Sequence, residues 1–109
     1  MLNKIVISDL LSKACVITEM QAKSKIDVIE QLTQALCDEG VIDNKQGFIK
    51  DVLAREALGS TGFENQIAIP HGKSCWVNET RIAVAKLKDN VDWETMDSSD
   101  VKLVILFAV

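Results

Sequence analysis

The 109-residue sequence predicts a layered α/β domain, and three observations indicate this fold class. Residues 25–39 and 45–58 carry apolar side chains at helical spacing. Residues 81–87 and 101–109 are nearly continuous apolar runs, as is typical of strands inside a sheet. Helices and strands that alternate in this way, in a chain of this length, form one domain with helices layered on a sheet. We therefore expect a three-layer α/β/α fold with a mixed sheet.

The opening of the chain alternates short apolar runs with polar breaks. We expect strands at Ile5–Ile7 and Ala14–Ile17. Between them, Ser8–Ser12 is expected to form a helical turn that Ser8 caps.

The first of the two helices is expected over Lys25–Glu39. Its apolar residues recur at spacings of three and four and make one stripe: Ile26, Ile29, Leu32 and Leu36. Ser24 is the expected N-cap, with Asp27 three residues further on. Gly40 stands where a left-handed C-terminal cap is wanted.

The second helix is expected over Lys45–Leu58, and Gly59 ends it. The residues expected to face inward are Phe48, Ile49, Val52, Leu53 and Ala57. Asp43 is the expected N-cap, with Gln46 at the matching capping-box position.

Three strands are expected in the remainder, at Ile67–Pro70, Arg81–Leu87 and Val101–Val109. The polar, turn-rich segment 89–100 lies between the last two. No helix follows the final apolar strand to cover the sheet. We therefore expect residues 1–109 to form a single domain short of its C-terminal helices, with an apolar face through which copies self-associate.

Composition and charge exclude several classes of protein. The chain has 12 basic and 16 acidic residues and a net charge of -4, which argues against nucleic acid or an anionic membrane as its main partner. No stretch approaches the roughly 20 apolar residues of a membrane span, and the N-terminus shows no secretory signal. The three widely spaced cysteines do not resemble a disulfide framework or a zinc site. These observations favour the cytoplasm.

The only histidine, His71, is the strongest candidate for a functional residue. It follows a glycine-rich loop and a short apolar strand that Pro70 stops, and Gly72 stands beside it. This position predicts an imidazole at the exposed rim of a sheet, where functional side chains tend to lie. Imidazole can act as acid, base or nucleophile near neutral pH.

Arg55 lies 16 residues before His71, at the end of the second predicted helix. It is either a solvated arginine that complements the helix dipole, or a guanidinium delivered beside the imidazole. The second hypothesis favours a phosphoryl ligand, because an arginine fork matches phosphate oxygens.

Other chemistry near His71 fits the residues less well. Gly72-Lys73-Ser74 resembles the end of a phosphate-binding P-loop, but Ile67 stands where that motif needs glycine. A small hydrolase with His71 as base and Ser74 or Cys75 as nucleophile is a further hypothesis. A metal site is disfavoured, since His71 has no second histidine and no clustered acidic partners.

The stretch REALGSTGFENQIAIPHGKS, from Arg55 to Ser74, closely resembles the active-site signature of a known family. This family is the enzyme IIA domains of the fructose/mannitol class, in the phosphoenolpyruvate-dependent sugar phosphotransferase system. The resemblance extends over essentially the whole chain, including the segment Val91–Trp93.

The resemblance implies a phosphohistidine relay that serves sugar uptake. His71 would accept a phosphoryl group from the histidine phosphocarrier protein and pass it to a cysteine of a cognate IIB domain. Arg55, the Thr61 hydroxyl and backbone N–H groups after His71 would hold the phosphoryl oxygens, with no metal or other cofactor. A hydrogen bond to one ring nitrogen of His71 would fix its tautomer. A regulatory relative in the nitrogen-related branch of the family would carry the same site.

Overall fold

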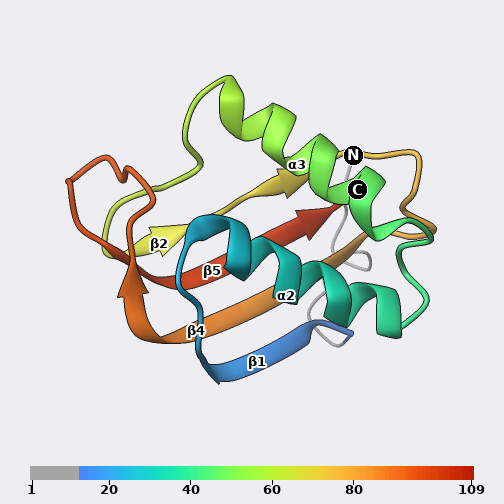
Figure 1. The fold of residues 1–109 in the computed structure, drawn as a ribbon, viewed down its shortest axis with the longest axis horizontal. Coiled ribbons are helices and arrows are strands. Elements are labelled where there is room, and N and C mark those ends of the chain that lie inside the picture. The colour runs from blue at the N-terminus through green and yellow to red at the C-terminus, as the bar shows by residue number, and fades with distance from the viewer. Residues whose placement is uncertain (1–12) are drawn as a thin grey trace.

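The computed structural model describes residues 13–109, which form a five-stranded sheet and two helices (Figure 1). In chain order the elements are β1 (Cys15–Met20), α2 (Lys25–Asp38), α3 (Lys45–Ala57), β2 (Ile67–Ala68), β3 (His71–Gly72), β4 (Arg81–Val91) and β5 (Val101–Ala108). The strand and turn expected within residues 5–12 lie outside the described residues. The expected strand at 14–17 is confirmed as β1.

The sheet is mixed, as the sequence predicts. Strand β1 runs parallel to β4, and β4 runs antiparallel to β5. Both β2 and β3 run parallel to β5, so that β5 lies inside the sheet with neighbours on both edges. The prediction that the last apolar run is an interior strand is therefore confirmed.

Both helices lie on one face of the sheet (Figure 1). The strand register pairs Ala83 with Leu106 and Ala85 with Val104, and all four residues are buried in the core beneath the helices. The predicted α/β class is confirmed, and the described residues supply the sheet and one helical layer.

The opposite face of the sheet is less buried. Leu103, Ile105 and Phe107 of β5 are only half-buried on this face, and Val16 of β1 is exposed. The apolar run 81–87 predicts a strand inside the sheet, where both faces are normally covered, but Lys86 is exposed. Its ammonium remains in water because no opposite charge lies within ion-pair distance in residues 13–109.

The first helix, α2, begins and ends as its sequence predicts. The Ser24 side chain caps it, because its Oγ accepts a hydrogen bond from the N–H of Asp27 at 3.2 Å. The chain leaves α2 through Gly40, whose φ of 74° is the left-handed conformation that glycine tolerates. The predicted stripe is buried except at Ile26, which stands exposed in the first turn.

The second helix, α3, differs from the prediction in two places. Its N-cap is Asn44 rather than Asp43, because the Asn44 side chain accepts a hydrogen bond from the N–H of Gly47. The Asp43 carboxylate instead accepts a hydrogen bond from the side chain of Asn78. Ala57 was expected to face inward and is exposed, whereas Glu56 is buried.

The strand expected over Ile67–Pro70 is shorter in the structure, because β2 ends at Ala68 and a second strand, β3, begins at His71. Pro70 interrupts the ladder, but the chain rejoins β5 at once, so His71 lies within β3 instead of beyond the strand end. Gly72 permits this return. A Cβ atom there would meet the Phe48 ring and would lie 2.8 Å from Cγ2 of Val52, so only glycine lets β3 pack directly against α3.

Candidate functional site

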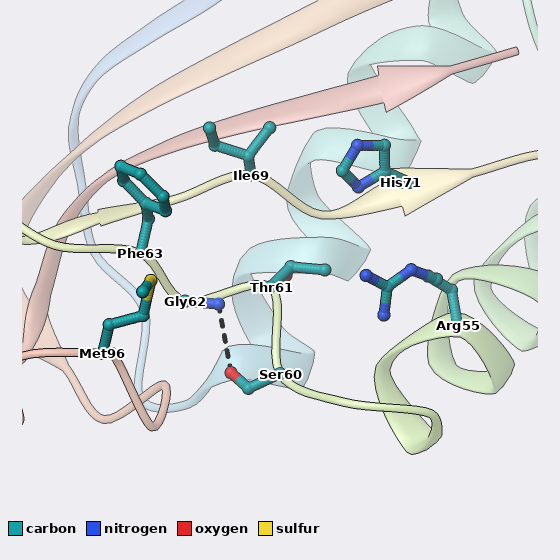
Figure 2. Close-up of a pocket in the computed structure, with 8 residues that line it drawn as sticks. All are labelled: Arg55, Ser60, Thr61, Gly62, Phe63, Ile69, His71 and Met96. Carbon is teal, nitrogen blue, oxygen red and sulfur yellow. Dashed lines mark hydrogen bonds between the residues drawn. The ribbon is translucent and has the colours of Figure 1, made fainter.

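An open pocket of about 320 Å³ lies where α3, the loop after it and β3 meet (Figure 2). It contains all three residues that the sequence singles out: His71, Arg55 and Thr61. The complete lining is Arg55, Ser60, Thr61, Gly62, Phe63, Ile69, His71 and Met96.

The imidazole of His71 lines this pocket and is exposed, as predicted. Its ring stacks on the Phe107 ring of β5, with ring centroids 5.7 Å apart and an angle of 17° between the planes. Among residues 13–109 neither ring nitrogen has a hydrogen-bond partner, so these residues do not supply the tautomer-fixing bond that we expected. Stacking on Phe107 orients the exposed ring.

Arg55 lies in the last turn of α3, and its guanidinium points towards Thr61 and His71 (Figure 2). Its Nη1 donates a hydrogen bond to the carbonyl of Gly59 at 2.8 Å. No carboxylate pairs with it in the part of the chain that the structure describes. A positive charge that is anchored but not neutralised suits an anionic ligand in the pocket.

Thr61 lines the pocket, but its hydroxyl is occupied below the surface. Its Oγ1 donates a hydrogen bond to Oε1 of Glu56 and accepts one from Nε1 of Trp93 at 3.2 Å. The end of the side chain that faces Arg55 in Figure 2 is a carbon. In this structure Thr61 therefore presents its methyl group to the pocket.

Sequence reasoning missed the residues beneath the pocket. Glu56 is buried and pairs with Lys25 of α2, whose Nζ lies 3.0 Å from Oε2 of Glu56. Trp93, to which the sequence assigned no role, is also buried and donates its indole N–H to the Thr61 hydroxyl. Glu56 had one detectable signal, because a glutamate four residues after the inward-facing Val52 occupies the buried side of the helix. No sequence signal connects Trp93 to Thr61.

The hydrolase hypothesis gains no geometric support. Among the described residues, Ser74 Oγ accepts a hydrogen bond from the backbone N–H of Trp76. Neither the Ser74 nor the Cys75 side chain is hydrogen-bonded to His71 in this part of the chain. A nucleophile and its base normally lie within hydrogen-bond distance of each other. Within residues 13–109, no group of three or more His, Cys, Asp and Glu residues is placed to hold a metal ion. No helix in this range is long and apolar enough to cross a membrane.

Comparison with known proteins identifies the family. Residues 9–109 match the family model described as "Phosphoenolpyruvate-dependent sugar phosphotransferase system, EIIA 2". The match covers nearly the whole chain, including Arg55, Thr61 and His71. The chain therefore belongs to this family of phosphotransferase-system enzyme IIA domains, as its resemblance indicated.

Individual relatives agree with this assignment. The chain is 31% identical over 99 residues to the PTS system fructose-like EIIA component of Escherichia coli, covering 91% of this chain and 67% of that protein. It is 34% identical over 102 residues to the PTS system fructose-specific EIIABC component of Bacillus subtilis. That match covers 94% of this chain but only 16% of the relative.

A solved structure has the same fold. The nitrogen regulatory protein IIA-Ntr from Neisseria meningitidis superposes with a TM-score of 0.81 at 27% identity, over 95% of this chain and 70% of that one.

Proposed function

We propose that this chain is a phosphohistidine carrier of the sugar phosphotransferase system. His71 accepts a phosphoryl group from the histidine phosphocarrier protein and passes it to a cysteine of a cognate IIB domain, which serves sugar uptake. The observation that carries the proposal is the shared pocket of the exposed His71 imidazole and the unneutralised Arg55 guanidinium.

The transfer needs a lone pair on a ring nitrogen of His71 and a group that stabilises the negative charge on the phosphoryl oxygens. An unprotonated ring nitrogen of His71 forms a bond to phosphorus while the N–P bond of the donor phosphohistidine breaks, and the proton of His71 stays on its other ring nitrogen. Arg55 supports the charge on the equatorial oxygens through its planar fork of N–H groups. In the second transfer a cysteine thiolate attacks the same phosphorus, and the His71 nitrogen leaves with its electron pair.

The backbone after His71 offers a further donor. The N–H of Lys73 has no acceptor among residues 13–109, so it remains available as one of the backbone donors proposed after His71. The open shape of the pocket suits a donor and an acceptor that are themselves proteins, because each must bring its reacting atom to the exposed imidazole.

The partners and location are proposed on related grounds. The name of the B. subtilis relative joins the A, B and C components in one protein, which supports a IIB domain as the acceptor for this chain. The three cysteines are free thiols, which suits a reducing compartment such as the cytoplasm.

A regulatory role is the second candidate. The similarity to IIA-Ntr from N. meningitidis favours it, since a regulator of this kind would use the same phosphorylated histidine and signal to other proteins. The two roles differ in the acceptor and share the site.

Intact mass measurement tests the proposal. The chain is incubated with phosphoenolpyruvate and the general phosphotransferase proteins, and then with a candidate IIB domain. We expect the mass of one phosphoryl group to appear on the chain and then to move to the IIB domain. A chain that is phosphorylated but discharges to no IIB domain supports the regulatory role. A chain that gains no phosphoryl group, but hydrolyses model esters, refutes both roles.

A further inference from the structure

A buried polar cluster lies directly beneath the pocket and connects four separate segments of the chain. Its members are Lys25 of α2, Glu56 of α3, Thr61 of the loop after α3, and Trp93 of the segment after β4. The sequence predicted no contact among these four residues.

Both carboxylate oxygens of Glu56 accept hydrogen bonds. Oε1 accepts the hydroxyl hydrogen of Thr61, and Oε2 accepts the Thr61 backbone N–H at 3.2 Å and the Lys25 ammonium at 3.0 Å. The side chain of Glu56 is 4% exposed and that of Lys25 is 26% exposed. A buried carboxylate is costly in free energy when it loses a hydrogen-bond partner. The Glu56 side chain is therefore held where it keeps its contacts with Thr61 and Lys25.

Trp93 closes the cluster from the other side. Its indole N–H donates to Thr61 Oγ1, and its ring lies 5.7 Å from the Lys25 ammonium. Its backbone carbonyl accepts a hydrogen bond from the Ser60 hydroxyl at 2.5 Å. The loop is therefore held between α3 and the segment that contains Trp93.

The same loop residue connects this cluster to the candidate phosphoryl acceptor. Thr61 bonds Glu56 through its N–H, and its carbonyl accepts the N–H of Ile69, two residues before His71, at 3.0 Å. Arg55 is adjacent to Glu56 in sequence and is bonded to Gly59 of the same loop. A shift of this loop would therefore change the placement of both Arg55 and His71.

We propose that Glu56 is a positioning residue for phosphoryl transfer, which rests on the function proposed above. It holds the loop of residues 59–62, through Thr61, in the one arrangement that turns Arg55 and His71 towards the same pocket. Thr61 acts in this cluster through its hydroxyl and backbone, and contacts with the phosphoryl group come from Arg55 and from backbone N–H groups.

Glu56→Gln tests the proposal, because it keeps the size of the side chain and removes its charge. We expect the maximal rate of phosphorylation by the phosphorylated donor protein to fall by about tenfold or more. The KM for that donor should stay within about twofold, since the docking surface is unchanged. Glu30→Gln is the matched control, because Glu30 is an exposed glutamate of α2 without a side-chain partner among the described residues. It should leave both constants unchanged.

The two tryptophans supply a second readout, which does not depend on transfer. In Glu56→Gln, the indole N–H resonance of Trp93 should move, because Glu56 no longer holds the Thr61 hydroxyl that accepts this N–H. In Thr61→Val it should move because the accepting hydroxyl is removed. That of Trp76, which is 39% exposed and outside the cluster, should not move. Thr61→Ser keeps the hydroxyl and should restore both the resonance and the rate.

The outcomes separate this proposal from the proposed function. An unmodified chain that accepts no phosphoryl group refutes the proposed function and, with it, the positioning role. If the unmodified chain is phosphorylated, a folded Glu56→Gln variant that reacts at the same maximal rate overturns the positioning role alone. If Glu56→Gln does not fold, Thr61→Val decides, because it keeps the Lys25–Glu56 ion pair. A Thr61→Val variant with an unchanged rate and an unchanged Trp93 resonance overturns the proposal.

Discussion

The close approach of β3 to α3 depends on Gly72, and the substitution Gly72→Ala measures that dependence. The added methyl group would overlap the ring of Phe48 and lie 2.8 Å from Cγ2 of Val52, and all three residues are buried. Phe48 and Val52 are both 0% exposed, so neither has space into which to retreat. Insertion of a methyl group into a close-packed core costs about 1–3 kcal/mol.

Thermal unfolding followed by circular dichroism gives the size of this effect. For a domain of this length, a loss of about 1–3 kcal/mol corresponds to a fall in Tm of roughly 5–15 °C. Gly47→Ala is the control. The Cβ of that variant would also meet a side chain, the indole of Trp76, but this ring is partly exposed and can move away. Alanine also favours the helix, so Gly47→Ala should change the stability by less than about 1 kcal/mol.

A double-mutant cycle identifies the cause. Phe48→Leu shortens the side chain that the new methyl group would meet, so the double variant should lose less stability than the two single variants together. We expect a coupling of about 0.5 kcal/mol or more between residues in contact. Strictly additive effects, or a Gly72→Ala variant as stable as the unmodified chain, would refute the argument that β3 packs against α3 without room for a side chain.

Four further predictions concern the site, its support and the surface. Arg55→Lys should change the stability by no more than about 0.5 kcal/mol, because Arg55 is exposed, whereas loss of the planar fork should slow phosphorylation roughly tenfold; equal transfer rates would show that no bidentate contact is made. Lys25→Met should cost about 1–3 kcal/mol in urea unfolding, because it leaves the buried Glu56 unpaired, with the usual cost reduced by the partial exposure of Lys25. Hydrogen bonds from the side-chain hydroxyl and the backbone N–H of Ser99, and from the N–H of Asn65, lower the pKa of Asp97 from 3.8 to about 2. The stability that Asp97 contributes is therefore present above pH 3.8 and is lost as the pH falls through about 2. Asp97→Asn should flatten this part of the profile of unfolding free energy against pH. Burial raises the pKa of Cys15 and of Cys37, which lowers the fraction of reactive thiolate at these two residues. Iodoacetamide at about pH 8 should therefore modify the exposed Cys75 first, and peptide mapping would reveal the order.

Periodicity and capping residues predicted much of the fold, because these signals are local. The helices α2 and α3 follow from the spacing of their apolar residues, and Ser24 and Gly40 mark the ends of α2. The cap of α3 was misassigned because Asp43 and Asn44 are both good capping residues, and only the contact of Asp43 with Asn78 separates them.

The candidate site was predicted in its exposed part and missed in its buried part. His71 stands out as the only histidine, whereas the residues alone left two roles open for Arg55, and the family resemblance of the stretch 55–74 joined the two. The contacts of Glu56 with Lys25 and of Thr61 with Trp93 join segments 31 and 32 residues apart, which no local pattern encodes. The pairing of β3 with β5 beyond Pro70 was missed for the same reason, since strand pairing is decided by the tertiary structure.

The central claim is that His71 carries the phosphoryl group, and mapping of the modified residue tests it most directly. The chain is phosphorylated from phosphoenolpyruvate through the general phosphotransferase proteins, digested at alkaline pH and analysed by tandem mass spectrometry. We predict one acid-labile, base-stable phosphoryl group on His71, and no label on His71→Ala. A phosphoryl group on Ser74, on Cys75 or on any residue of the His71→Ala variant would contradict the account.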